Sequence, residues 1–228
     1  VVKKLEKSYL GKDFERGRGS FLRSLAKTLI PADLESLKEK QIYYIIGPSG
    51  SGRTTLVAKL AALIADNVQS SSIILSEMNN GNGLISENLR GFARLLNLKT
   101  SIVENQKAPL HELDRQKTIV DVSSNFVEAS ESIFQAKKIF GHKNVSVILT
   151  LPGGSSNRLI ENLCKSTNEL NPIIALSKLD ECEIGPEEFS KLSELDSKIA
   201  IITGTDNIVG SLAISSENVL TQYLKENC

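Results

Sequence analysis

A glycine-rich segment between a predicted strand and a predicted helix constrains the fold of this chain more than any other feature. Residues 47–55 read Gly-Pro-Ser-Gly-Ser-Gly-Arg-Thr-Thr, directly after the apolar run 42–46 and at the start of the helical pattern 54–65. Glycines let the backbone wrap closely around a phosphate with successive N–H groups turned inward, and the helix adds the positive end of its dipole. The order strand, glycine loop, helix is the setting that a P-loop requires. A plain Gly/Ser-rich turn is the alternative, but it leaves the glycine spacing and the Thr-Thr pair unexplained.

The nine residues of this segment are the ones that we expect around a bound phosphate: Gly47, Pro48, Ser49, Gly50, Ser51, Gly52, Arg53, Thr54 and Thr55. Thr54 stands where a P-loop hydroxyl coordinates Mg²⁺ between the β- and γ-phosphates. Arg53 stands where the motif has a lysine. A guanidinium keeps the positive charge but is larger, planar and forked, whereas an ammonium is compact. We therefore expect that any phosphate contact of Arg53 lies at a different place from that of a lysine.

Downstream of residue 41, short apolar runs alternate with helical patterns. The strand candidates are 42–46, 72–75, 101–103, 118–122, 145–150, 173–176 and 199–202. The helix candidates are 54–65, 86–96, 126–140, 158–167, 186–195 and 216–225. Several of the strands are continuous apolar runs, which is typical of a parallel sheet covered by helices on both faces. We predict an α/β fold, a three-layer P-loop NTPase with a mostly parallel central sheet.

The first forty residues differ in character from the rest of the chain. They are rich in Lys and Arg, and residues 21–30 have the apolar spacing of a helix that stops at Pro31, where a second short helix begins. We predict a short helical segment over 1–40 and a P-loop domain over 41–228. The basic cluster is interpreted as a solvated face, and contact with a partner or peripherally with a membrane is the alternative. The sequence begins at Val1 rather than Met, which leaves open whether it is part of a longer protein.

Composition narrows the classes of partner and location. Lys and Arg total 27, as do Asp and Glu, so a formal net charge of zero gives no global electrostatic reason to infer a nucleic-acid partner. No run of about 18 apolar residues and no secretory signal is visible. Cys164, Cys182 and Cys228 are widely spaced, and His111 and His142 are the only histidines, so we expect neither a zinc site nor a disulfide framework. Reduced thiols predict a cytoplasmic protein.

A second motif lies at the end of a predicted strand. Ser177-Lys178-Leu179-Asp180 follows the apolar run 173–176. An aspartate in this place accepts two hydrogen bonds from N1–H and the exocyclic amino group of guanine, which adenine does not supply, while the lysine stem lies across the base. A site built around such bonds rejects analogues that lack them by up to about 10⁴-fold. Alone, the pattern also fits a solvated loop; after a strand and downstream of a P-loop, it predicts that Lys178 and Asp180 read guanine.

These two motifs, together with Leu-Val-Ala-Lys-Leu-Ala at 56–61, resemble the signal-recognition-particle GTPase family over about residues 41–228. That family includes the signal recognition particle protein, its receptor and the GTPase that places bacterial flagella, and the flagellar branch is the nearest in its P-loop helix and C-terminal part. The resemblance implies a G domain that binds GTP or GDP with Mg²⁺ near Thr54 and Asp121. It places Gly204, in the loop 203–207, near the guanine. It also implies face-to-face pairing, as a homodimer or with a relative, and it makes 1–40 the truncated remainder of a helical N-domain.

The departures from the family pattern all affect residues that the resemblance assigns to GTP hydrolysis. Asp-Thr-Ala-Gly-Arg, expected after the strand that leads to the γ-phosphate, is Asp121-Val122-Ser123-Ser124-Asn125 here, so the glycine and the arginine are replaced. Asp-Thr-x-Arg, expected after the second strand, falls in residues 77–83, which read Glu-Met-Asn-Asn-Gly-Asn-Gly and contain neither the aspartate nor the arginine. A missing catalytic arginine alone costs about 10³-fold or more in rate. We therefore predict guanine-nucleotide binding with weak, partner-dependent or lost GTP hydrolysis, and we assign no catalytic residue.

Two other functions stay open. One is a pseudo-GTPase adaptor that binds no nucleotide, which Arg53 and the segment 121–125 favour. The other is a P-loop ATPase or kinase, which the glycine loop alone permits, although no acidic pair marks a phosphate acceptor. The expected biological role is in protein targeting or in polar and flagellar placement. Residues 151–157, Leu-Pro-Gly-Gly-Ser-Ser-Asn, are interpreted as the turn after the strand 145–150 and not as a second phosphate loop, because they lack a Lys-Thr end.

Overall fold

The computed structural model describes residues 3–66, 70–79, 83–104, 107, 109, 116–124, 126–204 and 207–227. Of the positions discussed above, those outside the described residues are Val1, 80–82, His111, Asn125, Thr205, Asp206 and Cys228. The structural statements below concern the described residues.

A mixed sheet of eight strands forms the centre of the molecule, with the order β3-β2-β4-β1-β5-β6-β7-β8. All neighbouring strands are parallel except the last pair, β7 and β8. The strands are β1 (Ile42–Ile46), β2 (Ile73–Met78), β3 (Lys99–Ile102), β4 (Lys117–Val122), β5 (Val145–Pro152), β6 (Ile173–Ser177), β7 (Ile199–Thr203) and β8 (Leu212–Ile214). The predicted α/β fold with a mostly parallel sheet is confirmed.

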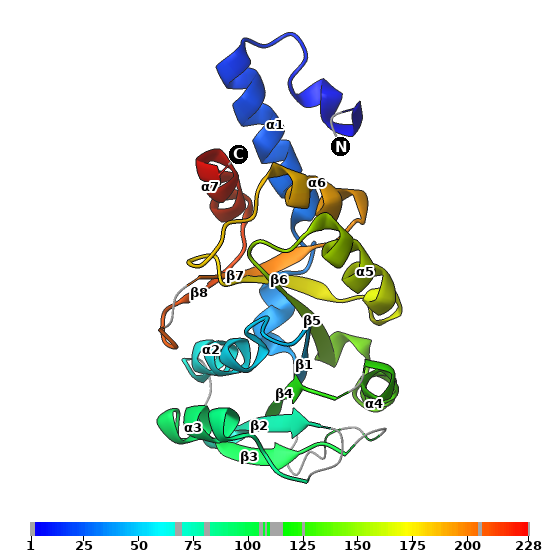
Figure 1. Ribbon diagram of the computed structural model, residues 1–228, viewed down its shortest axis with the longest axis vertical. Coiled ribbons are helices and arrows are strands. Elements are labelled where there is room, and N and C mark those ends of the chain that lie inside the picture. Colours follow the sequence, from blue (N-terminus) through cyan, green and yellow to red (C-terminus); the bar gives the residue numbers. More distant parts are fainter. Residues whose placement is uncertain are drawn as a thin grey trace.

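Helices cover both faces of this sheet (Figure 1). The α-helices are α1 (Phe14–Leu29), α2 (Arg53–Ala65), α3 (Glu87–Leu95), α4 (Phe126–Phe140), α5 (Asn157–Thr167), α6 (Pro186–Glu194) and α7 (Glu217–Asn227). Short 3₁₀ helices are η1 (Lys3–Ser8), η2 (Glu35–Glu39), η3 (Ser70–Ser72), η4 (His142–Asn144) and η5 (Asn168–Leu170). None of the described helices combines the length and the apolar character needed to cross a membrane.

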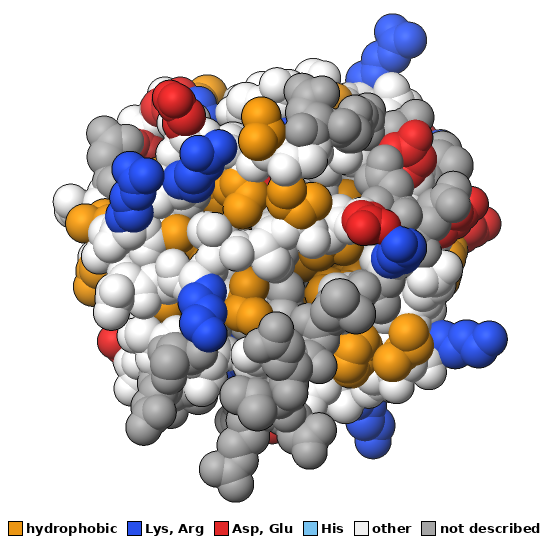
Figure 2. Space-filling view, turned by 90° about the horizontal axis from the view of Figure 1, so that it is seen from below, with side chains coloured by type: hydrophobic (Ala, Val, Ile, Leu, Met, Phe, Trp, Pro, Cys, Tyr) orange, Lys and Arg blue, Asp and Glu red, His pale blue; other side chains and the backbone are white. Residues whose placement is uncertain are grey.

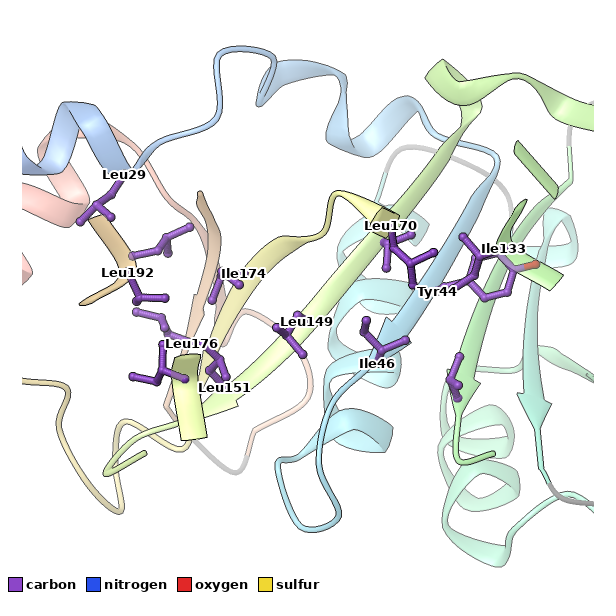
Figure 3. Packing of buried hydrophobic residues seen from close by; sticks show 14 of the residues in the cluster. Leu29, Tyr44, Ile46, Ile133, Leu149, Leu151, Leu170, Ile174, Leu176 and Leu192 are labelled. Carbon is purple, nitrogen blue, oxygen red and sulfur yellow. The ribbon is translucent and has the colours of Figure 1, made fainter. Parts of the chain in front are cut away.

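The fully buried strand β1 shows how the sheet separates two apolar cores. Ile42, Tyr44 and Ile46 belong to the core under α1 and α4–α7, whereas Tyr43 and Ile45 belong to the core under α2 and α3. This alternation follows from the two-residue repeat of a strand, which turns successive side chains to opposite faces. Figure 3 shows the first core, in which Leu29 of α1 and Leu192 of α6 lie on the side of β6, and Tyr44 of β1 lies beside Ile133 of α4.

Helix α1 packs against the end of the domain. Its residues Leu25 and Leu29 lie in the same apolar core as Leu220 and Leu224 of α7, and the two helices lie side by side (Figure 1). The basic side chain of Arg16 is 85% exposed. The division of the chain at residue 40 stays a prediction, and α1 shares its core with the domain that follows it.

Several boundaries differ from those predicted, most of them by one to three residues. Helix α1 begins at Phe14 rather than near residue 21, because Asp13 caps it by accepting a hydrogen bond from the N–H of Arg16. Strand β5 continues to Pro152, two residues beyond the predicted end, through its pairing with β6. Strand β8 was not predicted, because three residues are too few to show an alternation of apolar and polar positions.

Charged side chains of both signs lie on the face at the β2–β3 end of the molecule. Basic and acidic side chains are interspersed around its margin, and apolar side chains appear between them (Figure 2). Large apolar side chains that are exposed in this part of the chain include Leu95 of α3 and Ile102 of β3. This face therefore carries no field of a single sign, in line with the formal net charge of zero.

Candidate nucleotide site

The segments that the two motifs occupy meet at one edge of the sheet. The P-loop follows the carboxyl end of β1, Asp121 lies near the end of β4, and Lys178 and Asp180 follow β6. The crossover after β1 runs to β2 on one side of β1, and the crossover after β4 runs to β5 on the other side, so the direction of the crossovers reverses at β1. In open α/β sheets, ligands bind outside the carboxyl ends of the strands at such a switch point.

The loop between β1 and α2 has the backbone of a phosphate cradle. Gly47, Gly50 and Gly52 have φ of 152°, 77° and 81°. The N–H groups of Arg53, Thr54 and Thr55 donate to no carbonyl in the described part of the chain, and the helical ladder starts with the N–H of Leu56. These N–H groups at the start of a helix are the donors that a phosphate accepts from.

Gly47 is required at its position for a steric reason. A Cβ atom there would lie 2.8 Å from the carbonyl oxygen of Thr150 and 2.9 Å from Oγ of Ser51. We expect Gly47→Ala to lower the free energy of unfolding by about 1–3 kcal/mol, since alanine meets both the contact and the positive φ. Chemical denaturation measures this, with Gly91→Ala as the control, because a Cβ on Gly91 of α3 meets nothing within 4 Å. Equal effects of the two substitutions would contradict the steric reason.

Thr54 and Asp121 form a candidate metal site. Oγ1 of Thr54 donates to Oδ2 of Asp121 at 2.5 Å. Asp121 is 3% exposed, and its Oδ1 is buried without a hydrogen-bond partner in the described structure. Burial raises the pKa of Asp121, the hydrogen bond from Thr54 and the charge of Arg53 oppose this rise, and Glu77 adds to it.

This oxygen pair fits Mg²⁺. Magnesium is commonly held by one or two protein oxygens together with phosphate oxygens and water, so a larger ligand cluster is not needed. The described residues contain no group of three or more His, Cys, Asp or Glu side chains placed to hold a metal. The unpartnered Oδ1 of Asp121 is an atom that a cation would satisfy.

The end of β4 and the segment after it form hydrogen bonds with α2 and with the end of β2. The guanidinium of Arg53 donates to the carbonyl of Val122. The N–H groups of Ser123 and Ser124 both donate to the carbonyl of Met78, at 2.9 and 3.0 Å. Ser124 stands where the family pattern has the glycine whose N–H senses a γ-phosphate, and here that N–H is already engaged at the end of β2.

Glu77, at the end of β2, is a buried carboxylate that was not singled out from the sequence. It is 6% exposed and lies opposite Asp121 in the β2–β4 register. Its Oε2 accepts a hydrogen bond from the N–H of Ser86, the capping residue of α3, at 2.7 Å, and its Oε1 accepts one from Oγ of Ser123 at 3.3 Å. Glu77 thus joins the start of α3 to the segment after β4.

The loop after β6, which contains Lys178 and Asp180, contacts the P-loop between β1 and α2 and is called the base-reading loop below. Oγ of Ser177, the last residue of β6, donates to the carbonyl of Ser51 at 2.7 Å. Lys178 has a positive φ of 57°, and its ammonium pairs with Glu181 at 3.0 Å. A pocket of about 240 Å³ lies between the two loops, and among its lining residues are Gly52, Thr55, Lys59, Lys178, Asp180 and Thr203. The structure thus brings Lys178 and Asp180 to the pocket that adjoins the P-loop.

Lys59 is a site residue that the sequence reasoning did not assign. It is 3% exposed, and its ammonium donates to Oγ1 of Thr203 at 2.8 Å across the pocket. The signal was present, because Lys59 is the one charged residue in the otherwise apolar stretch 56–62. Lysine is almost never fully buried without a partner, so a lone lysine in an apolar helix indicates a functional contact.

Two glycine positions show how tightly the surrounding loops pack. A Cβ on Gly204 would lie 2.9 Å from Cβ of Leu179 and 3.0 Å from the backbone nitrogen of Asp180, so Gly204 lies against the loop after β6. A Cβ on Gly153 would lie 1.6 Å from the carbonyl oxygen of Cys182. The N–H of Gly153 donates to the carbonyl of Ser177 at 2.8 Å. The turn between β5 and α5 therefore spans residues 153–156, because Leu151 and Pro152 belong to β5 and Asn157 begins α5, and it packs against the loop after β6.

Comparison with known proteins gives distant relatives. No family model matches the sequence. The flagellar biosynthesis protein FlhF of Borreliella burgdorferi is 26% identical over 212 residues, which is 88% of this chain and 48% of that protein. FlhF of Campylobacter jejuni is 22% identical over 218 residues, which is 90% of this chain and 44% of that protein. The chain spans about half the length of the curated relatives it matches.

Solved structures show the same fold. A crystal structure of FlhF complexed with GTP and Mg²⁺ matches with a TM-score of 0.71 and 18% identity over 98% of this chain and 90% of that one. Chloroplast FtsY from Physcomitrella patens matches with a TM-score of 0.74 and 16% identity over 97% of this chain and 78% of that one. The chain thus has the fold of the G domains of signal-recognition-particle-type GTPases and is similar to FlhF in sequence and to FlhF and FtsY in structure.

Proposed function

We propose that this chain binds guanine nucleotides with Mg²⁺ and that its own GTP hydrolysis is weak, partner-dependent or lost. The observation that carries the binding is the open row of N–H groups at the start of α2, next to the pair Thr54–Asp121 with its unpartnered Oδ1. Phosphate oxygens would accept from these N–H groups. Thr54 and Asp121 would hold Mg²⁺, which supplies charge neutralisation between the phosphates when bound.

The pocket supports guanine as the base. The carboxylate of Asp180 would accept hydrogen bonds from N1–H and the exocyclic amino group. Lys178 would lie along the base, and the buried ammonium of Lys59 donates to Oγ1 of Thr203 in the lining of the pocket. Gly204 keeps the neighbouring loop close enough to hold Asp180 in place.

Weak hydrolysis follows from the residues at the γ-phosphate end. Phosphoryl transfer depends on positioning water and neutralising charge on the transferred group. The segment 121–125 has no arginine, and the N–H of Ser124 is engaged by Met78. The described residues at the end of β2 offer Glu77 rather than an aspartate, and that carboxylate is engaged by Ser86 and Ser123.

The cellular role is proposed from the relatives. FlhF is named as a flagellar biosynthesis protein, and we propose that this chain acts in flagellar placement or in protein targeting. A second copy or a related GTPase would pair with it across the nucleotide. We also propose a cytoplasmic location, with the basic segment around the exposed Arg16 as a peripheral contact with the membrane.

Equilibrium titration tests the binding. Fluorescent GDP is expected to bind in the presence of Mg²⁺, an ATP analogue is expected to bind much more weakly, and chelating Mg²⁺ is expected to lower the affinity. Asp121→Asn should reduce the dependence on Mg²⁺, because it removes a negative ligand. The absence of binding by any nucleotide would instead favour an adaptor that retains the fold, which the contact between Arg53 and Val122 supports as the second candidate.

A further inference from the structure

We propose, on the basis of the nucleotide binding proposed above, that Arg53 is a specificity-determining residue that makes the site prefer guanosine diphosphate to the triphosphate. Three features of the site carry this proposal: the place of the Arg53 guanidinium, the engagement of the N–H donors after β4, and the negative charge at the end of β2. Each concerns the position of a third phosphate and leaves the P-loop donors for the first two phosphates unchanged.

The side chain of Arg53 reaches from α2 to strand β4. It is the first residue of α2, and its guanidinium donates to the carbonyl of Val122. The next residue of the helix, Thr54, contacts the preceding residue of the strand, Asp121. Adjacent residues of α2 thus contact adjacent residues of β4. A compact ammonium would be free to follow phosphate oxygens, whereas one nitrogen of the forked guanidinium is engaged by the Val122 carbonyl and fixes the place of the group.

The donors that a third phosphate would use are occupied. The N–H groups of Ser123 and Ser124 both donate to the carbonyl of Met78. Oγ of Ser123 lies 3.3 Å from Oε1 of Glu77 and 3.2 Å from the Met78 carbonyl. A γ-phosphate would have to displace these bonds before it gained a donor, because a buried carbonyl that loses its partners costs free energy. The N–H groups of Arg53 and Thr54 need no such displacement.

Negative charge at the end of β2 adds to the expected difference in affinity between the diphosphate and the triphosphate. Glu77 and Asp121 are buried register partners on neighbouring strands. Mg²⁺ between Thr54 and the phosphates would offset Asp121, whereas Glu77 has no ion pair with a cation in the described structure. Like charges in a buried site repel, so the additional negative charge of a triphosphate is disfavoured next to Glu77 and the Val122 carbonyl.

The ratio of two affinities tests the proposal. Titration of the whole chain with GDP and with a non-hydrolysable GTP analogue, both with Mg²⁺, is expected to give a dissociation constant at least about 10-fold lower for GDP, a difference of about 1.4 kcal/mol. Arg53→Lys is expected to move this ratio to about one or below, because the ammonium leaves Val122 and becomes available to the third phosphate. Arg158→Lys is the matched control, since Arg158 is an exposed arginine in the first turn of α5, and it should leave the ratio unchanged.

The outcomes separate this proposal from the one on which it rests. Equal affinities of the unmodified chain for both nucleotides, or an unchanged ratio in Arg53→Lys, would overturn the diphosphate preference while guanine binding stands. No binding of either nucleotide would overturn guanine binding itself and the preference with it. Where Arg53→Lys does not fold, the ratio for the unmodified chain decides alone, since a GTP analogue bound as tightly as GDP contradicts the proposal.

Discussion

Replacing Asp180 with asparagine is expected to lower the affinity for GDP by about 10³- to 10⁴-fold and to remove the preference for guanine over adenine nucleotides. The carboxylate would accept two hydrogen bonds from guanine, and the asparagine amide would turn a donor toward a donor. Asp180 is exposed in this structure, and a bound base would cover it, so base donors left without a partner would lose water and gain nothing, which costs more than one ordinary hydrogen bond. Titration with fluorescent GDP and ATP analogues measures both quantities.

Two controls accompany this prediction. Asp196→Asn is the same chemical change at an exposed residue in the turn after α6, and asparagine tolerates its positive φ of 53°, so GDP affinity should not change. Xanthosine diphosphate carries an acceptor where guanine carries the amino group, so the Asp180→Asn variant should bind it better than the unmodified chain does. Unchanged GDP affinity in Asp180→Asn would mean that the pocket beside Lys59 does not hold the base.

Single-turnover hydrolysis of GTP with Mg²⁺ is expected to be about 10³-fold slower than in a family member that retains the arginine after Asp-Thr-Ala-Gly. The chain lacks that arginine, and the segment after β4 is already engaged by the contacts of Ser124 with Met78 and of Arg53 with Val122. Quenched samples with excess protein over GTP measure the chemical step without product release.

Measuring the hydrolysis rate at several protein concentrations distinguishes partner-dependent hydrolysis from lost hydrolysis. A rate per molecule that rises with protein concentration indicates that a second copy supplies the missing groups, and a rate independent of concentration indicates that hydrolysis is lost in the chain alone. A rate equal to that of an ordinary family member would refute the damage inferred from residues 121–125. Chain that is denatured and then cleared by filtration controls for a contaminating phosphatase.

Much of the fold could be predicted from the sequence because its signals are local. The run 42–46 coincides with β1, and the helix predicted over 54–65 differs from α2 by one residue. Apolar periodicity and the glycine spacing of the P-loop act within about ten residues, so the strand order along the chain and the positions of both motifs are legible without a structure. The start of α1 and the short β8 were missed, because a cap and a three-residue strand leave little periodicity.

The contacts that set the chemistry of the site were decided by the tertiary structure. Arg53 meets Val122 across 69 residues, Ser177 meets Ser51 across 126, and Lys59 meets Thr203 across 144. The sequence showed that Arg53 was unusual and that the segment 121–125 was altered, but it did not show that the two contact each other. Which side chain meets which carbonyl depends on the spatial order of the strands, with β4 and β5 on either side of β1, and no local pattern in the sequence encodes that order.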